Sequence, residues 1–383
     1  MTRASDLARL LGAGGSLSGA LSVDTISEKT SGSGVTIDSL NVKDGGIGGQ
    51  QIGGRRNIII NGAMQINQRG NTTGNGVSGG SGVYSVDRYN LYHNGSEAVA
   101  NLQQSTDVPS GEGFGNSYLI DVTTAESSVA AGEIAVLRQI LEGYDLQGLK
   151  YGTSSAESVT LSFYVKSPKT GVHICELYHL ASSGSKTQSQ SYTVNSANTW
   201  EKKTITFSGD TATALDNDSS YTIAVQWGIF AGTTYTSGTL QTSWGSIDNA
   251  NRFVGQQNLF DNTSNNFYLT GVQFEVGSQA TPFEHRSFGE ELALCQRYFQ
   301  DLNFSSQGYP PSSGYFQSDV NFPTAMRATP TATITDGSKS GTSGYTTAAD
   351  SISENACRVE NQTSGNNARA FHLNGVLKLD AEL

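Results

Sequence analysis

The histidines on either side of Glu176 have a spacing that could bind a metal ion. His173, Glu176 and His179 follow one another at intervals of three residues. On a β-strand, however, His173 and His179 share one face while Glu176 points to the other. Neither zinc-protease spacing nor a third ligand is present. We therefore predict no metal site in this stretch.

Two neighbouring carboxylates have the residue type that glycoside cleavage requires. Asp216 and Asp218 lie in the polar run ALDNDSS, and runs of Asp, Asn and Ser usually form turns. The chain has no fixed-period repeat of the kind that builds long β-helices. It also has no G-x-S-x-G, no P-loop and no dinucleotide-binding fingerprint. We predict that the protein is not an enzyme.

Aromatic side chains could bind sugars, because a flat ring covers the apolar face of a pyranose while amides and carboxylates bond its hydroxyl groups. Trp227 alternates with core residues and is predicted to be buried, whereas Trp244, in QTSWGSIDN, has loop-like neighbours. Packing at the core or at a sheet edge is the alternative role for Trp244. Near the C-terminus, tyrosines and asparagines lie among Gly, Ser and Thr. The predicted ligand contacts are Tyr309, Tyr315, Tyr345, Asn361, Asn366 and Trp244.

The charge balance limits the class of partner. The formal net charge is −11 and no basic cluster offsets it, which disfavours nucleic acid and anionic membranes. No apolar run reaches the length of a membrane span, and the first residues are too weakly apolar for a secretory signal. We expect assembly in a cytosol. The three cysteines, Cys175, Cys295 and Cys357, are predicted to be small buried side chains.

Composition favours a mostly β protein. The chain contains 45 Gly but only 15% charged residues, with 16 Tyr and 15 Phe, as in short strands joined by tight turns. Residues 57–287 are predicted to form one β-sandwich of jelly-roll type, with Gly70–Gly82 and Ser182–Ser191 as loops and Glu133–Glu142 as a short helix. The strands expected are Tyr118–Val122, Val159–Lys166, Val172–Tyr178, Lys203–Phe207, Tyr221–Phe230 and Phe267–Val276.

The last of these strands leads into a helix predicted over 288–300. Ser287 and Glu290 have the spacing of a capping box, in which each side chain satisfies a backbone donor at a helix start. The predicted apolar stripe of this helix consists of Phe288, Leu292, Cys295 and Phe299.

The two ends of the chain are predicted to form separate units. At the N-terminus, residues 1–12 suggest a short helix with Leu7, Leu10 and Leu11 as its apolar stripe. Residues 13–56 suggest short strands buried by three intertwined copies, with a flexible linker as the alternative. At the C-terminus, residues 301–383 are predicted to form a small β unit. Its expected strands are Tyr315–Phe322, Phe322–Thr335 after a turn, Ala356–Glu360, Arg369–Leu373 and Val376–Leu379.

Three motifs resemble one family. NIIINGAMQINQRG (Asn57–Gly70) with SVDRYNLY (Ser85–Tyr92), SANTWEKKTITFSGD (Ser196–Asp210) and FEVGSQATPFEHRSFGEELALCQRYF (Phe274–Phe299) are similar to the carbohydrate-binding-module-like jelly roll of tailed-phage tail fibres. The resemblance implies a fibrous homotrimer of the virion tail. In such a fibre the N-terminus, with Leu7, Leu10 and Leu11, attaches to the tail, baseplate or an adaptor. The C-terminal tip binds a host surface receptor, expected to be a glycan.

The resemblance also bears on individual residues. It implies structural roles for Glu275, Glu284 and His285 at the end of the last strand and the start of the helix. Related jelly rolls often hold a structural calcium. The resemblance leaves this open here, with Asp87 and Asp121 as candidates and no other cofactor expected. The alternatives to a receptor-binding fibre are a polysaccharide-cleaving tail spike and a purely structural fibre or adaptor.

Overall fold

The computed structural model is mostly β, as the composition predicts. The chain divides into two compact units, residues 1–54 and 55–383. None of the helices in the described part is long and apolar enough to span a membrane. The structure describes residues 35–37, 40–43, 46–47, 50–51, 55–76, 82–95, 98–182, 184–308, 315–340, 345–363 and 371–383.

In the first unit the described residues form a four-stranded antiparallel sheet in chain order. Apolar residues are register partners in this sheet: Val35 lies opposite Val42, which lies opposite Ile47. Leu7, Leu10 and Leu11 lie outside the described residues, and the homotrimer and shaft stay predictions. The strands are β1 (Val35–Ile37), β2 (Leu40–Lys43), β3 (Gly46–Ile47) and β4 (Gln50–Gln51).

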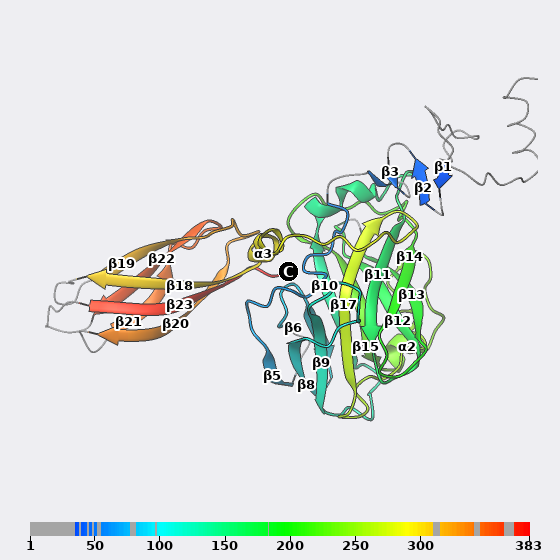
Figure 1. The fold of residues 1–383 in the computed structure, drawn as a ribbon, viewed down its shortest axis with the longest axis horizontal. Helices are drawn as coiled ribbons and strands as arrows, with labels where there is room; N and C mark the ends of the chain where they lie inside the picture. Colours follow the sequence, from blue (N-terminus) through cyan, green and yellow to red (C-terminus); the bar gives the residue numbers. More distant parts are fainter. Residues whose placement is uncertain are drawn as a thin grey trace, which may run out of the picture. The chain divides into compact units, whose positions relative to one another are not determined.

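The second unit begins with a two-sheet β-sandwich, here called the larger sandwich (Figure 1). One sheet has seven strands in the order β16-β13-β12-β15-β10-β7-β6, and the other has six in the order β14-β11-β17-β9-β8-β5. The strands are β5 (Thr72–Gly76), β6 (Gly82–Tyr84), β7 (Asn90–Asn94), β8 (Val99–Ser105), β9 (Ser117–Thr124), β10 (Ile134–Glu142), β11 (Val159–Lys166), β12 (Gly171–His179), β13 (Lys186–Val194), β14 (Glu201–Phe207), β15 (Tyr221–Ala231), β16 (Gly245–Ser246) and β17 (Asn266–Val276). Short helices are η1 (Gly143–Leu149), α2 (Thr233–Thr236) and η2 (Asn249–Asn251).

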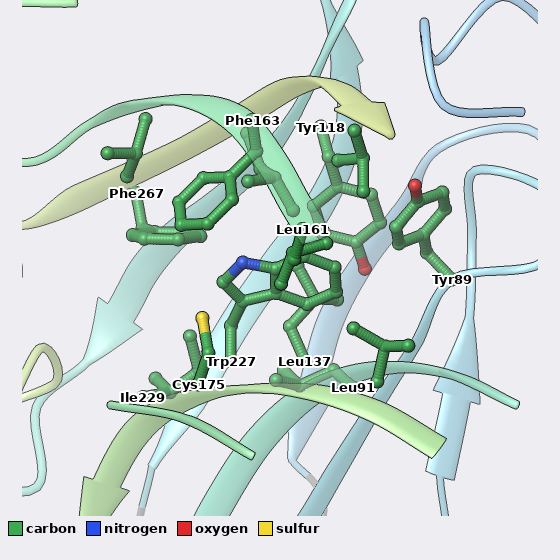
Figure 2. Close-up of a cluster of buried hydrophobic side chains, with 14 of the residues drawn as sticks. Tyr89, Leu91, Tyr118, Leu137, Leu161, Phe163, Cys175, Trp227, Ile229 and Phe267 are labelled. Atoms are coloured by element: carbon green, nitrogen blue, oxygen red, sulfur yellow. The ribbon is translucent and has the colours of Figure 1, made fainter. Parts of the chain in front are cut away.

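The inward faces of the two sheets meet in one apolar core (Figure 2). Trp227 of β15 is fully buried there, as its alternation with apolar residues predicts. Its indole meets the ring of Phe163 on β11 edge-on, with ring centroids 5.8 Å apart, a favoured geometry for aromatic pairs. The prediction that Cys175, Cys295 and Cys357 are buried is confirmed, and all three are free thiols.

Three local predictions were wrong. Gly70–Gly82 is not all loop, because Thr72–Gly76 forms the edge strand β5, which pairs with β8. Glu133–Glu142 forms no helix, because Ile134–Glu142 is the interior strand β10, paired with both β7 and β15. Its apolar residues are buried on both faces, so the alternation that marks a half-buried strand is missing. Ser182–Ser191 is not all loop, since most of it belongs to β13. Buried polar side chains stabilise that strand, with Gln188 donating to the Thr242 carbonyl at 2.9 Å.

The helix after β17 is α3 (Phe288–Gln296), shorter than predicted. Ser287 caps it, and its Oγ accepts the Glu290 backbone N–H at 3.3 Å. Cys295 packs with Ile60, Ile66, Tyr298 and the partly buried Leu292. Phe288, predicted in the same stripe, is 60% exposed. Phe299 is buried but begins the next strand instead of ending the helix.

The remaining residues form a second, smaller β-sandwich, here called the knob. Its two three-stranded sheets have the orders β18-β23-β20 and β19-β22-β21. The two strands predicted at 369–373 and 376–379 are one continuous strand, β23. The strands are β18 (Phe299–Gly308), β19 (Tyr315–Asn321), β20 (Thr331–Ser340), β21 (Tyr345–Asp350), β22 (Ala356–Thr363) and β23 (Phe371–Asp380).

Candidate functional site

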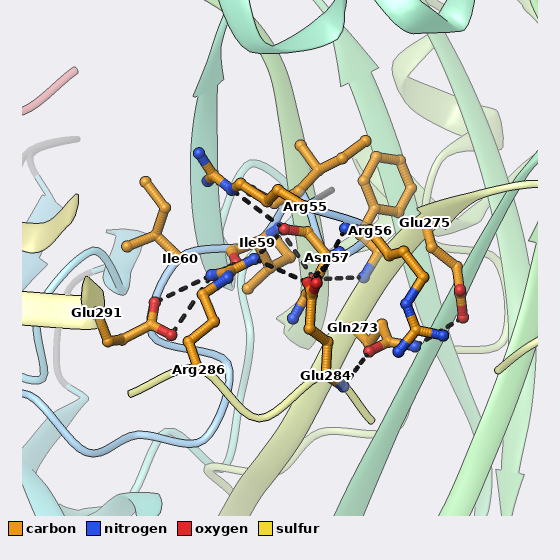
Figure 3. A network of polar contacts seen from close by, with 12 residues as sticks. Arg55, Arg56, Asn57, Ile59, Ile60, Gln273, Glu275, Glu284, Arg286 and Glu291 are labelled. Atoms are coloured by element: carbon orange, nitrogen blue, oxygen red, sulfur yellow. Dashed lines mark hydrogen bonds and ion pairs between the residues drawn. The ribbon is translucent and has the colours of Figure 1, made fainter. Parts of the chain in front are cut away.

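The motifs at 57–70 and 274–299, far apart in the chain, meet in one polar network (Figure 3). The side-chain amide of Asn57 makes two hydrogen bonds to the backbone of β17. Its Nδ2 donates to the Val272 carbonyl at 3.0 Å and its Oδ1 accepts the Phe274 N–H at 3.0 Å. Glu284 accepts the Asn57 N–H at 2.7 Å. Arg286 donates to the Ile59 carbonyl at 3.1 Å. The network holds the segment after β17 against the start of the larger sandwich.

Glu275 is a second fixed point of this segment. It is fully buried, and it accepts the Thr281 N–H at 2.8 Å and the Thr281 hydroxyl at 2.6 Å. Gln273 also donates to Glu275 at 2.8 Å. These bonds close the turn between β17 and Pro282. Glu275 and Glu284 thus have their oxygens engaged by backbone and amide donors within the fold.

This turn forms one wall of the larger cleft, a cavity of about 490 Å³ on the outer face of the six-stranded sheet. Its aromatic lining comes from three places: Phe114 from the loop before β9, Tyr164 from β11, and Phe283 with His285 from the fixed turn. Ring centroids within this group are 4.9–5.6 Å apart. Four rings therefore share one surface beside the sheet.

A glycine makes room for this group of rings. Gly271 of β17 has φ of +60°, and a β-carbon there would lie 2.6 Å from Phe114 Cζ and 2.9 Å from Tyr164 Cδ2. The pairing of β17 with β11 shifts register between Ser162 and Tyr164. Such a bulge redirects side chains locally, and only glycine fits a left-handed backbone at this close approach.

The cleft also carries charged groups of both signs. Glu112 accepts the Tyr164 hydroxyl at 2.5 Å, and the Lys202 ammonium lies 5.8 Å from the Tyr164 ring centroid. Burial, together with the Glu112 carboxylate, raises the pKa of Tyr164 to about 12, so its hydroxyl stays protonated at neutral pH. The larger cleft thus combines tilted and edge-on aromatic rings with adjacent hydrogen-bond donors and acceptors.

The predicted ligand contacts are distributed differently. Trp244 is half-buried: its Nε1 donates to the Ser208 carbonyl at 2.6 Å, and its ring lies edge-on to Tyr151 with centroids 5.8 Å apart. Asn361 is fully buried within β22, where its Oδ1 accepts the Thr347 hydroxyl at 3.1 Å. The structure thus gives Trp244 and Asn361 packing and hydrogen-bonding partners inside the fold.

The tyrosines predicted in the knob fall at one end of it. Tyr315 begins β19 and Tyr345 begins β21, and in the register both lie beside the end of β22. Tyr309 and Asn366 lie outside the described residues. The segments that contain these two, together with 341–344, connect strand ends that gather at this same end of the knob.

The candidate metal and catalytic residues have local partners. Glu176 pairs with Arg252 at 2.6 Å, and His173 stacks on Tyr192. Asp216 accepts from Ser182 and Asp218 from Ser220, as in turns.

The candidate calcium residues have amide partners. Asp87 accepts from Gln68, and Asp121 from Asn101. Over the described ranges, no three His, Cys, Asp or Glu side chains are grouped to share a metal ion.

Sequence reasoning missed most of the larger cleft. Only His285 was singled out, and for a structural role; Phe114, Tyr164 and Phe283 were not. A signal was present in ATPFEHRSF, where two rings flank a glutamate just after a proline. Side chains that project from such a turn can line a surface beside the sheet. Which residues of other segments lie next to them depends on the tertiary fold, so the sequence did not identify Phe114 and Tyr164.

No protein-family model and no curated protein matches this chain. Among solved structures it is similar to the enzymatically active domain of tailspike protein 4 of bacteriophage CBA120, with 15% identity over 56% of this chain and a TM-score of 0.29. The match spans 22% of that tailspike chain.

Two further solved structures are similar over their full length. One is a putative sugar-binding protein of Bacteroides thetaiotaomicron, with 12% identity over 58% of this chain and a TM-score of 0.33. The other is a family 11 carbohydrate-binding module of a cellulosomal cellulase of Clostridium thermocellum, with 14% identity over 55% of this chain and a TM-score of 0.27. Likenesses at this level assign neither a fold nor a function here.

Proposed function

We propose that this chain is a tail fibre protein of a tailed phage, which attaches the virion to a host surface glycan. The N-terminal residues join it to the tail, and three copies form the fibre. The motifs at Asn57–Gly70, Ser196–Asp210 and Phe274–Phe299 support the fibre assignment. Several weak sites on one trimeric fibre would raise avidity without any new contact.

The larger cleft is the observation that supports glycan binding. Tyr164, Phe283 and His285 place rings beside the Glu112 carboxylate and the Lys202 ammonium. A pyranose needs this combination, an apolar face next to groups that bond hydroxyls. A binding role would also account for two rings of the 274–299 motif, Phe283 and His285, which line the cleft and are not fully buried.

The end of the knob that carries Tyr315 and Tyr345 is the second candidate contact. Its strand ends are connected by 309–314, 341–344 and 364–370, which carry Tyr309 and Asn366. Binding residues commonly lie where the strands of a rigid scaffold end.

The proposed activity is binding and not cleavage. Asp216 and Asp218 are the carboxylates considered for catalysis. Asp216 accepts a hydrogen bond from Ser182, and Asp218 accepts one from Ser220 in its own loop. Neither of them lines the larger cleft.

Cell staining with the labelled full chain tests binding. Phe283→Ala should reduce staining of host cells at least tenfold, whereas Tyr144→Ala, which removes a ring that is 57% exposed on η1, should not. If Phe283→Ala stains normally but a Tyr315→Ala, Tyr345→Ala double variant does not, the knob is the binder. If the unaltered chain stains no host of the phage, it is a structural fibre or adaptor.

Two further measurements address the rival functions. Mass spectrometry of purified virions should find this chain, and its absence would remove the fibre assignment. Release of reducing sugar from host envelopes by the purified chain would favour the polysaccharide-cleaving spike instead.

A further inference from the structure

The outer face of the seven-stranded sheet carries a second aromatic cavity, here called the tyrosine groove. Its volume is about 260 Å³. Four of its lining residues are tyrosines and two are arginines: Tyr92, Tyr178, Tyr221, Tyr235, Arg138 and Arg252. We infer that the tyrosine groove binds an acidic saccharide, a sugar whose carboxylate pairs with Arg138.

A polar row crosses the sheet, and two of its members, Arg138 and Gln226, line the groove. Arg138 of β10 is the register partner of Gln226 on β15, which is in turn the partner of Glu176 on β12. Register partners on adjacent strands share one face. All three therefore lie on the outer face, away from the core that holds Leu137 and Trp227. A row of one amide and two charged groups, on the face of the sheet that points away from the apolar core, is not required for core packing.

The walls of the groove are aromatic. The loop that contains α2 and η2 folds over the sheet and brings Tyr235 and Arg252 to one side, where Phe253 packs on Ile174 and Val136. Arg252 lies 5.0 Å from the Tyr178 ring centroid, and Arg138 lies 4.6 Å from that of Tyr92.

The two arginines differ in their charge balance. Arg252 is neutralised by Glu176 through a fork of two bonds, at 2.8 Å and 2.6 Å. Arg138 uses only its Nε, which donates to Asn90 Oδ1 at 3.0 Å. Within the described ranges, no carboxylate lies within ion-pair distance of Arg138. The groove therefore has one surplus positive charge, on a chain whose net charge is −11.

This surplus selects the ligand. The terminal nitrogens of a guanidinium match the two oxygens of a carboxylate, and tyrosine rings cover the apolar face of a pyranose. Burial raises the pKa of Tyr178 and of Tyr221, so their hydroxyls remain hydrogen-bond donors. The net charge of the chain repels long polyanions. A short saccharide with one acidic residue at the groove fits these conditions.

The inference does not rest on the proposed function, since it concerns another sheet face and another ligand charge. A neutral glycan in the larger cleft and an acidic one in the tyrosine groove can each be present or absent without the other. The experiment therefore measures the two sites with separate variants.

The test is calorimetric titration of the full chain with sialyllactose, tetragalacturonate and a hyaluronan tetrasaccharide. Each is compared with a neutral counterpart: lactose for the first, and the carboxyl-reduced oligosaccharide for the other two. We expect at least one acidic sugar to bind tenfold or more tightly than its counterpart. Arg138→Gln should abolish that preference, while Lys202→Gln, which removes one positive charge from the larger cleft, should leave it intact.

Further arms keep the test decisive if Arg138→Gln folds poorly. Arg138→Lys keeps the charge without the fork and should retain part of the preference. The affinity of the unaltered chain should fall as sodium chloride is raised, because partly exposed charges are screened. Equal binding of acidic and neutral sugars, no binding of any of the three, or full competition by inorganic phosphate at equal ionic strength would each overturn the inference.

Discussion

Arg88, from the motif that follows β6, forms an ion pair with Glu382, which lies just after the last strand in the sequence. Both side chains are almost fully buried, at 1% and 5% exposure. Arg88 also donates to the Ile140 carbonyl at 2.5 Å, and its guanidinium lies 3.3 Å from the Tyr298 ring centroid. Arg69 adds a 2.7 Å pair with Asp380. The end of β23 and the residues just after it are thus tied to the larger sandwich by two ion pairs, of which the Arg88–Glu382 pair is buried.

Glu382→Ala should destabilise the protein strongly, because it leaves the Arg88 guanidinium buried without its carboxylate. Removing one partner of a buried pair typically costs about 3–5 kcal/mol. Urea unfolding followed by tryptophan fluorescence measures this loss. Asp319→Ala is the matched control, since its partner Arg358 is 38% exposed, and exposed pairs contribute about 1 kcal/mol or less. Equal effects of the two changes would contradict the anchoring role.

Asp87→Asn should change how stability depends on pH. Burial, partly offset by hydrogen bonds from Gln68, raises the pKa of Asp87 from 3.8 to about 6. The folded chain therefore keeps a proton that the unfolded chain has lost, so this contribution is present below about pH 4 and disappears as pH rises through 6. Between pH 4 and 7 the unaltered chain should lose about 2 kcal/mol more than the variant. If the free energies of unfolding of the unaltered chain and of the variant changed in parallel with pH, this prediction would be wrong.

Gly271→Ala should damage the larger cleft and the fold around it. The new β-carbon meets Phe114 and Tyr164 within 3 Å, on a left-handed backbone. We expect a loss of about 3 kcal/mol from strain and overpacking, together with weaker glycan binding at the larger cleft. Gly115→Ala is the control, because no atom lies within 4 Å of its β-carbon position. Calorimetric melting of both variants provides the comparison.

Trp244→Ala separates packing from binding. The indole contacts Tyr151 and His179 and bonds the Ser208 carbonyl, so we expect a stability loss of about 2 kcal/mol, less than for a fully buried tryptophan. Affinity for glycan should be unchanged at a temperature where the variant is folded. A loss of affinity without a loss of stability would restore Trp244 as a ligand contact.

Sequence reasoning predicted the strands in which one face is apolar. Val159–Lys166 was placed to the residue, and Tyr221–Phe230 within one residue of β15. It failed on β10 and β13 for opposite reasons. β10 is buried on both faces and shows no alternation, whereas β13 buries Gln188 and Ser189 through hydrogen bonds that no hydrophobic pattern marks.

Neither cavity could be read from the chain. The larger cleft needs Phe114, Tyr164 and Phe283 from three separate segments, and it depends on a bulge that redirects Tyr164. The tyrosine groove likewise depends on register, which sets Arg138 beside Gln226. Alternation predicts which residues leave the core, but it does not predict which of them become neighbours.

The knob begins and finishes at the same place: Phe299, the first residue of β18, is the register partner of Asp380, the last of β23. Residues 299–380 therefore form a cassette with adjacent junctions. Exchange of this cassette between related chains would need compatibility only at the joint, where Arg69 of the larger sandwich pairs with Asp380 of the cassette. New knob sequences could then arise by recombination while the rest of the protein is left unchanged.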